Sequence, residues 1–402
     1  MAVYQNILDA GWLGLLRAGA SDVWDFTRDQ YLRGGQFLGT GGAGLTVTRA
    51  SDGYAETASG TLVNFGSGVL RRTDRGVLVE GARTNLLLRS QEFNDGYWTK
   101  QRSSATANAT TAPDGTLTAE KIVEDTTVTN SHDLRRSVSV TNGTVYTISI
   151  FAKAAERTWC AIFASFSSAT STTSFDLGAG VVGTVSANAT ATMTALANGW
   201  YRCTITVTAN ASSGAVFFYL ATGDGIAGTS YTGDGTSGAF FWGAQLEEAA
   251  FASSYIPTVA STVTRAADQV TVTLSALTSG YSMYAQWSGS QNGGSRVIDF
   301  GGSTLIRRSG GTNLNFNGAG LEGSAVGAFA SGKAAIAIDA AAVRGAANGS
   351  SVTVTTGSYS SSSQTALRFG STGTSNYLDG YIRRIAIFPS ALSDAQLQAI
   401  TT

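Results

Sequence analysis

The side chains that most often carry acid–base or metal chemistry are scarce in this sequence. The 402 residues contain one histidine, His132, and two cysteines, Cys160 and Cys203. A single histidine excludes most histidine-based catalytic schemes and metal centres from this chain alone. His132 lies in a strand-like phrase with no nucleophile-elbow motif beside it, so we interpret it as a sheet residue. Two cysteines are too few for a disulfide-dense scaffold.

Acidic residues do not show the spacing of a glycosidase pair. Glycoside hydrolysis usually needs two carboxylates about 5 to 9.5 Å apart. The acidic runs EKIVED (120–125) and QLEE (245–248) lack the alternation that would place such a pair on one strand. Acids from distant strands can still converge, so a polysaccharide depolymerase stays open as an alternative. We expect no catalytic residues and no enzymatic activity.

Aromatic residues near turns or in polar surroundings are the more informative set. Neutral sugars present C–H-rich faces and many hydroxyls, so their sites combine aromatic platforms with polar side chains and need little formal charge. The chain matches this need, because aromatic residues make up 10% of it and charged residues only 13%. For each residue the alternative is an ordinary core or edge aromatic. The candidate platforms are Tyr97, Trp98, Trp159, Tyr231, Trp287, Tyr359 and Tyr377.

Net charge and the ends of the chain exclude several partners. The formal net charge is −1, so no basic field exists to hold nucleic acid or an anionic membrane surface. No segment reaches the roughly 20 apolar residues that span a bilayer. The first basic residue is Arg17, so we expect no secretory signal peptide.

Composition and periodicity predict an all-β protein. The 49 glycines fit short strands joined by turns. Residues 145–152 and 201–207 alternate apolar and polar side chains, as a half-buried antiparallel strand requires. Residues 215–221 and 239–246 are apolar runs of strand length, expected in a core. We therefore predict two tandem antiparallel β-sandwich (jelly-roll) domains behind a short helical N-terminal segment.

The first twenty residues have a helical period instead. A helix here includes Gly11 and Gly14, which each cost up to about 1 kcal/mol, so it needs a packing partner. Two alternatives follow: the helix packs on its own domain, or it anchors the protein in a larger assembly. The apolar stripe consists of Tyr4, Ile7, Leu8, Trp12, Leu15 and Leu16.

Domain boundaries follow from these changes of pattern. Pro257 precedes a new series of strands that starts near Val270. A short C-terminal helix is predicted with Ser393 as N-cap and Gln396 at the capping-box position. We divide the chain into a helical anchor (1–20), a β-rich connecting region (21–85), a jelly roll (86–258) and a second sandwich (259–402). One heptapeptide recurs in the chain, as TVTRASD (46–52) and TVTRAAD (262–268), which indicates one kind of turn used twice or equivalent entries into two β-modules.

Several separated phrases resemble, in order, a jelly-roll module of bacteriophage and prophage structural proteins that is similar to carbohydrate-binding modules. The closing phrase YLDGYIRRIAIFPSALSDAQLQAIT (377–401) resembles the end of laminin-G-like or concanavalin-like sandwiches. In this reading Trp200 and Trp242 belong to the framework. The phrases of the first module are GVLVEGARTNLLLRSQEFNDGYWTK (76–100), APDGTLTAEKI (112–122), SHDLRRSVSV (131–140), GTVYTISIFAKA (143–154), NGWYRCTITV (198–207) and FFWGAQLEEAAFASSYIPT (240–258).

This resemblance implies a tail fibre or head spike of a bacteriophage or gene transfer agent. Such a protein assembles in the host cytoplasm, sits on the virion through its N-terminus against capsid or tail proteins, and binds host cell-surface polysaccharide. A homo-oligomer, typically a trimer, is expected because repeated weak contacts gain avidity. The alternatives are a purely structural decoration protein and a bacterial surface adhesin.

The resemblance also implies two details of chemistry. Jelly rolls of this kind often hold a structural calcium ion, for which Glu92, Asp95 and Glu247 are the candidate ligands; no other cofactor is expected. Cytoplasmic assembly favours Cys160 and Cys203 as buried free thiols rather than a disulfide.

Overall fold

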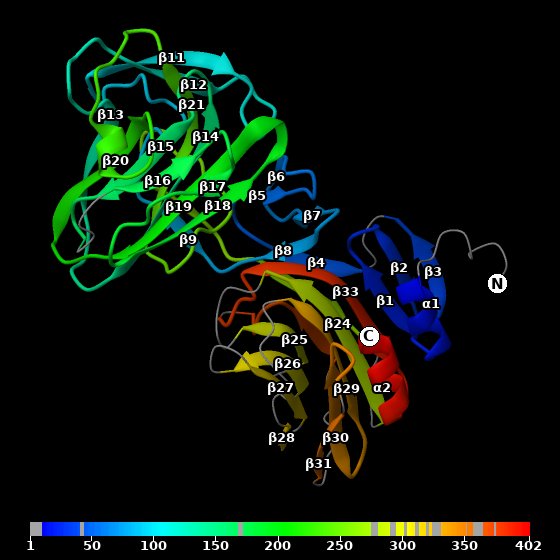
Figure 1. The fold of residues 1–402 in the computed structure, drawn as a ribbon. Coiled ribbons are helices and arrows are strands. Elements are labelled where there is room, and N and C mark those ends of the chain that lie inside the picture. The colour runs from blue at the N-terminus through cyan, green and yellow to red at the C-terminus, as the bar shows by residue number, and fades with distance from the viewer. Residues whose placement is uncertain are drawn as a thin grey trace. The chain divides into compact units, whose positions relative to one another are not determined.

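Antiparallel strands make up most of the chain in the computed structural model, which confirms the predicted all-β class (Figure 1). Two compact units are present: a terminal unit (residues 1–52, 65–82 and 266–402) and a central unit (53–64 and 83–265). No described helix is long and apolar enough to cross a membrane. The structure describes residues 10–40, 44–167, 172–274, 280–289, 295–300, 304–309, 313–318, 321–323, 331–350, 352–356, 365–373 and 375–402.

These units divide the chain differently from the sequence-based segments. Residues 21–85 do not form a connecting region of their own. Strand β1 (Asp22–Asp25) pairs with β33 (Gly380–Phe388), and β4 (Leu45–Thr48) pairs with β23 (Gln269–Thr273). Most of this segment therefore completes the C-terminal sandwich, a long-range pairing that local periodicity does not reveal.

The central unit is a sandwich of two sheets. One sheet has the order β10 (Thr99–Gln101), β13 (Asp133–Ser139), β20 (Ser213–Ala221), β15 (Trp159–Ala164), β16 (Thr173–Asp176), β17 (Val181–Val182). The other has the order β11 (Ser103–Thr110), β12 (Ala119–Glu124), β21 (Gly238–Glu247), β14 (Val145–Ala154), β19 (Trp200–Thr208), β18 (Ala189–Ala195). Short 3₁₀ turns lie at Ala197–Gly199 and Ile226–Thr229.

The core between these sheets follows the predicted alternation. Tyr146, Ile148 and Ile150 of β14 face it, as do Cys203 and Ile205 of β19. A side chain at every second position points to the same face of a strand, so the period-two pattern predicted this correctly. Both cysteines are buried and free.

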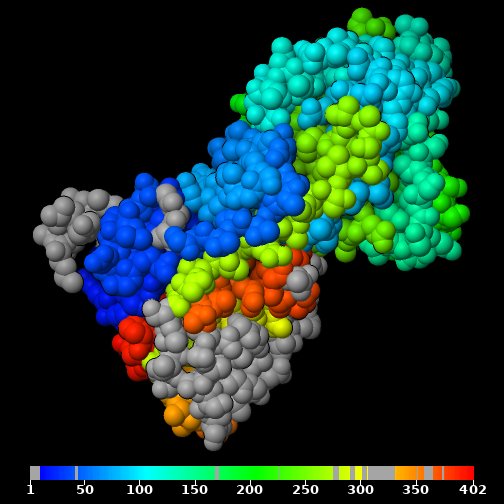
Figure 2. Space-filling view, turned by 180° about the vertical axis from the view of Figure 1, so that it is seen from behind, coloured from blue at the N-terminus to red at the C-terminus, as the bar shows by residue number. Residues whose placement is uncertain are grey.

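A second apolar cluster lies on the other face of β14. The hairpin of β5 (Gly53–Glu56) and β6 (Leu62–Phe65) contributes Tyr54 and Leu62 to it. Trp200 and Trp242 are buried in this cluster, which confirms their framework role. Early and late residues of the central unit are in contact. The Leu86 N–H donates to Leu246 O (2.9 Å). In Figure 2, the yellow-green atoms near residue 250 adjoin the cyan atoms near residue 100.

A further small pairing completes the central unit. Strand β9 (Arg83–Asn85) pairs with β22 (Val263–Arg265), which carries part of the repeated heptapeptide.

The terminal unit is also a sandwich. Its larger sheet has the order β3 (Gln36–Gly39), β2 (Gln30–Arg33), β1, β33, β24 (Tyr281–Ser288), β29 (Gly332–Ile338), β30 (Ala342–Ala347), β31 (Thr353–Thr356), with β8 (Gly76–Val79) on β33 and β7 (Arg72–Thr73) on β8. The opposing sheet has the order β28 (Leu321–Gly323), β27 (Asn313–Gly318), β26 (Thr304–Ser309), β25 (Arg296–Phe300), β32 (Ala366–Phe369), β23, β4.

Two helices pack on the outer face of the larger sheet. Helix α1 (Ala10–Arg17) buries Trp12 and Leu15, and α2 (Asp394–Thr401) buries Leu397, in one cluster with Tyr284 and Phe388. Trp12 and Leu15 are 0% and 2% exposed, so they are not presented to a partner as an anchor would require. The structure favours the alternative in which this helix packs on its own domain. Leu16 is half-buried beside the same cluster, and Tyr4, Ile7 and Leu8 lie outside the described residues.

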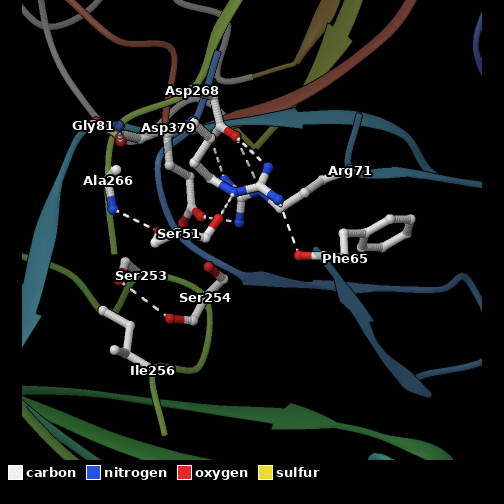
Figure 3. Close-up of polar contacts among 12 residues, drawn as sticks. Ser51, Phe65, Arg71, Gly81, Ser253, Ser254, Ile256, Ala266, Asp268 and Asp379 are labelled. Atoms are coloured by element: carbon white, nitrogen blue, oxygen red, sulfur yellow. Dashed lines mark hydrogen bonds and ion pairs between the residues drawn. The ribbon is translucent and has the colours of Figure 1, made fainter. Parts of the chain in front are cut away.

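A buried ion cluster joins distant segments of the terminal unit (Figure 3). Asp268 accepts from Arg49 (3.0 Å), from the Arg71 guanidinium and from the Glu80 N–H (2.9 Å), and Arg71 also pairs with Glu80 (2.7 Å). Arg49 and Asp268 come from the two copies of the heptapeptide, at positions four and seven. Arg49 also donates to the carbonyl oxygen of Phe65 (3.0 Å). The repeat therefore supplies both charges of one buried pair.

Candidate functional site

Four aromatic side chains lie on the outer face of the central unit's β13–β20–β15–β16 sheet. Trp159 and Phe163 of β15 and Phe217 and Tyr219 of β20 alternate with residues that face the core. Each is half-buried, and none belongs to an apolar cluster among the described residues. We call these four residues the aromatic strip.

The register of the strands brings the rings together. Phe163 is directly opposite Phe217, with ring centroids 5.6 Å apart. Phe217 and Tyr219 stack at 5.8 Å with only 7° between their planes. Ala161 and Ala221 share this face and are themselves buried, so small side chains lie between the rings. The result is an aromatic surface on this face of the sheet.

Hydrogen-bonding groups line one side of the aromatic strip. On β13, Asp133 lies opposite Tyr219 and Arg135 opposite Phe217. Asp133 accepts two hydrogen bonds from Arg135 (2.7 and 2.8 Å), and the guanidinium lies 4.9 Å from the Phe217 ring centroid. Burial and, secondarily, the Asp133 charge raise the pKa of Tyr219 to about 12, so the phenol stays protonated at neutral pH.

The other end of the strip is held by a loop contact at Trp159. A Cβ at Gly183 would lie 2.8 Å from the Trp159 ring and 2.4 Å from Asp224 Oδ1, so only glycine fits there. Asp224 accepts from the Thr184 N–H (2.7 Å) and hydroxyl (2.8 Å). These bonds lower the pKa of Asp224, so it remains ionised and fixed beside the strip.

The polar groups beside the aromatic strip are already paired with one another. The carboxylate of Asp133 is occupied by Arg135, and that of Asp224 by Thr184. No group of three or more His, Cys, Asp or Glu side chains in the described part of the chain is arranged to hold a metal ion. Aromatic rings beside hydroxyl and guanidinium groups suit a neutral ligand with C–H faces and hydroxyls.

Two predicted platforms are core residues. Trp98 and Trp287 are each 1% exposed, so their prediction as ligand platforms was wrong. Trp98 packs against Phe93 and Phe218 and donates its indole N–H to Arg89 O (3.0 Å). Proximity to a turn does not separate such residues from surface aromatics, because burial depends on partners from distant strands.

Three predicted tyrosines are half-buried, and their hydroxyls are already engaged. The Tyr97 hydroxyl accepts from the Leu88 N–H (3.1 Å), that of Tyr231 donates to Glu124 (2.8 Å), and that of Tyr377 donates to a backbone carbonyl (3.4 Å).

Two of these rings also have a charged or aromatic neighbour close to the ring. The Arg136 guanidinium lies 3.9 Å from the Tyr97 ring centroid, and His132 lies 4.7 Å from that of Tyr231. Neither ring belongs to the aromatic strip. Of the predicted platforms only Trp159 does, and Tyr359 lies outside the described residues.

The candidate calcium ligands are not brought together. Glu92 and Asp95 both pair with Arg89 (2.6 and 3.4 Å), whereas the buried Glu247 binds Ser253. A calcium ion at these residues stays a prediction. His132, interpreted from the sequence as a sheet residue, is fully buried and directly precedes β13; its carbonyl oxygen accepts from the Leu220 N–H (3.0 Å).

Sequence reasoning missed Phe163, Phe217 and Tyr219. The run AVFFYLA (215–221) was interpreted as wholly core because all its members are apolar. Successive side chains of a strand point to opposite faces. Because Phe218 and Leu220 face the core, Phe217 and Tyr219 lie on the opposite face of the sheet. Deciding whether that face is covered required the tertiary structure.

Comparisons with known proteins find likenesses at low TM-score. No protein-family model matches the chain, and no curated protein does. Domain 4 of AbnA, a GH43 extracellular arabinanase from Geobacillus stearothermophilus in complex with arabinotriose, is 15% identical with a TM-score of 0.27, covering 38% of this chain and 82% of that one. Domains LG4-5 of the mouse laminin alpha1 chain are 11% identical with a TM-score of 0.21, covering 65% and 85%. The CBM22-1–CBM22-2 tandem domain of Paenibacillus barcinonensis Xyn10C is 10% identical with a TM-score of 0.26, covering 79% and 99%. TM-scores this low do not establish a shared fold.

Proposed function

We propose that this protein is a non-catalytic polysaccharide-binding protein, and that the aromatic strip is the surface on which the sugar chain lies. The observation that carries the proposal is the stacked arrangement of Phe163, Phe217 and Tyr219 outside every apolar cluster of the described residues. An aromatic surface left on a folded domain marks a binding site more often than chance. Sugar rings stack on such a surface through their C–H faces, and the partly exposed guanidinium of Arg135 lies on the same sheet face to bond hydroxyls.

A neutral polysaccharide is the favoured ligand class. The charges beside the strip are paired, Arg135 with Asp133, so neither an acidic nor a basic polymer gains a net attraction. The chain as a whole carries a formal net charge of only −1. A neutral polysaccharide does not need a charged surface in order to bind, whereas an acidic polysaccharide would need unpaired cationic side chains.

The strip gives a direct test with matched variants. We expect Phe217→Ala and Tyr219→Ala each to weaken retention on the bound polysaccharide at least tenfold, which corresponds to about 1.4 kcal/mol. Tyr219→Phe keeps the ring and should lose less. Leu38→Ala, which changes an exposed apolar side chain of the terminal unit, is the control. The measurement is affinity electrophoresis against a panel of neutral and acidic bacterial polysaccharides.

Two outcomes contradict the proposal. If no polysaccharide retards the protein, or if the strip variants and Leu38→Ala behave alike, the strip does not bind sugar chains. Release of new reducing ends from the bound polysaccharide would show a depolymerase instead of a binding protein.

The biological setting we propose is the surface of a phage-like particle, where a fibre or spike oligomer adsorbs to a host glycan. The support is the ordered set of sequence phrases between residues 76 and 258 and the closing phrase at 377–401. Antibody labelling of purified particles tests this setting. Particles that lack the protein would contradict it while leaving polysaccharide binding intact.

A further inference from the structure

A polar pocket of about 410 Å³ lies in the central unit, at the edge formed by β11 and β12. The loop after β9 supplies Arg89, Gln91 and Asn94, while β11 and β12 supply Asn108 and Glu120. Its volume lies within the range of about 300–1,000 Å³ that small-molecule sites occupy. None of its lining residues belongs to the aromatic strip, so it is a separate feature of the same unit.

The lining of this pocket contains one cationic side chain, Arg89, and three carboxyl groups. Arg89 pairs with Glu92 (2.6 Å) and with Asp95 (3.4 Å), both of which line the pocket. The third carboxyl, Glu120, accepts from the Asn94 N–H (2.8 Å) and is only 2% exposed. Burial raises its pKa to about 7, so it carries a partial charge at neutral pH. The lining is therefore net acidic, which disfavours an anionic ligand.

The walls of the pocket are held in place before any ligand arrives. The Lys100 ammonium donates to four carbonyl oxygens of the loop, those of residues 93, 94, 95 and 98, at 2.9 to 3.3 Å. Asn108 adopts a left-handed conformation (φ 52°) within the register shift of β11. Thr118 accepts the indole N–H of the buried Trp242 (3.0 Å). A preorganised site loses less conformational entropy on binding.

The donors and acceptors that remain suit a ligand with several hydroxyl groups. The side-chain amides of Asn94 and Asn108 each offer both donors and an acceptor, whereas the Gln91 side chain also hydrogen-bonds with Tyr255; Glu120 can donate or accept because it titrates near neutrality. No aromatic ring lines the pocket, so binding here depends on hydrogen bonds rather than on stacking. The described acidic residues do not form a metal-holding group, which argues against a metal ion as the occupant.

We propose that this pocket is a second saccharide site that takes a single neutral sugar unit, such as the end of a chain. The proposal shares its ligand class with the proposed function but uses other residues and another kind of contact. A pocket site binds one unit and gains nothing from chain length, whereas an extended strip gains contacts with each further unit. The two sites can therefore be tested apart.

The test uses the full chain and saturation-transfer NMR with free monosaccharides: D-glucose, D-galactose, D-mannose, L-rhamnose and N-acetyl-D-glucosamine. We expect at least one of them to bind, and ¹H–¹⁵N correlation spectra of the ¹⁵N-labelled chain to show a shift of the Asn94 amide signal. Asn108→Gly keeps the left-handed backbone and removes the side-chain amide, and should weaken this binding at least fivefold. Asn198→Gly is the matched control, because Asn198 is exposed, has φ 58° and lies outside the pocket.

A second comparison separates this site from the strip. The double variant Phe217→Ala/Tyr219→Ala should retain monosaccharide binding, and Asn108→Gly should retain polysaccharide retardation. Absence of any monosaccharide binding overturns the pocket proposal, as does equal binding by Asn108→Gly and Asn198→Gly. An Asn94 shift caused by Ca²⁺ and by none of the sugars also overturns it. None of these results bears on the proposal for the aromatic strip, which is contradicted only by the polysaccharide-binding experiment.

Discussion

Burial changes the acid–base behaviour of Glu120 in the range around neutral pH. Its carboxyl is 2% exposed and accepts one backbone N–H from Asn94. Desolvation disfavours the charged form and outweighs the hydrogen bonds from Asn94 and Phe93 and the nearby Lys100 charge, so its pKa rises from 4.5 to about 7. The native state therefore holds this proton at pH values where the unfolded chain has lost it.

A stability change with pH follows from this shift. Between about pH 4.5 and 7 the native state binds more protons than the unfolded state at this group, so its contribution to the free energy of unfolding falls as pH rises. Glu120→Gln cannot titrate but still accepts from Asn94. We expect the variant to gain up to about 3 kcal/mol over the wild type between pH 4.5 and 7.5. Urea unfolding across this range measures it, and parallel curves for the two proteins would contradict it.

At the scale of elements, helix α1 is part of the terminal sandwich. The Trp12 indole N–H donates to Asp25 (2.8 Å), whose carboxylate also pairs with Arg384 of β33. Trp12 packs against Phe37 with ring centroids 6.2 Å apart. The hydrogen bond therefore connects the helix to β1, and the buried ion pair connects β1 to β33.

Removing the Trp12 side chain should destabilise the terminal unit. Trp12→Ala leaves a cavity and leaves Asp25 without one of its donors, at an expected cost of about 3–5 kcal/mol. Hydrogen-exchange mass spectrometry resolves the effect: peptides from β1, β24 and β33 should exchange faster, and those from β14 and β19 should not change. An anchor helix without a structural role would leave all of them unchanged. Leu38→Ala, at an exposed position, is the control.

At the scale of the whole molecule, the chain passes between its two units four times. The hairpin β5–β6 is separated in sequence from the rest of the central unit, yet Tyr54 lies 5.4 Å from Tyr255 between ring centroids. At its tip, a Cβ on Gly60 (φ 82°) would lie 2.6 Å from Leu196 Cα. The hairpin is therefore fitted closely to the sandwich that it covers.

A fragment of residues 83–265 tests this fit. It retains both sheets of the central unit but lacks Tyr54 and Leu62, which leaves the cluster around Phe151, Trp200 and Trp242 partly uncovered. We expect it to fold with lower stability than the same unit in the full chain and to bind the dye ANS more strongly. Equal stability and equal dye binding would show that the hairpin contributes nothing to the unit.

Local sequence patterns predicted the elements well. The strands expected at 145–152, 201–207, 215–221 and 239–246 are present as β14, β19, β20 and β21. The C-terminal capping box is present too: the Ser393 side chain accepts from the Gln396 N–H, and the Gln396 side chain accepts from the Ser393 N–H (2.9 Å). These features could be predicted because each depends on residues that are close together in the sequence.

The sequence by itself determined the all-β class, the core-facing side of the alternating strands β14 and β19, and the C-terminal helix. Only the tertiary structure decided which strands pair, and so which segments share a unit and which aromatic rings are covered. Trp98 and Trp159 look alike as predicted platforms, yet one lies in the core and the other on the outer face. The physical reason is that burial and register depend on partners far away in the chain, as with β1 and β33, and local periodicity contains no information about those partners.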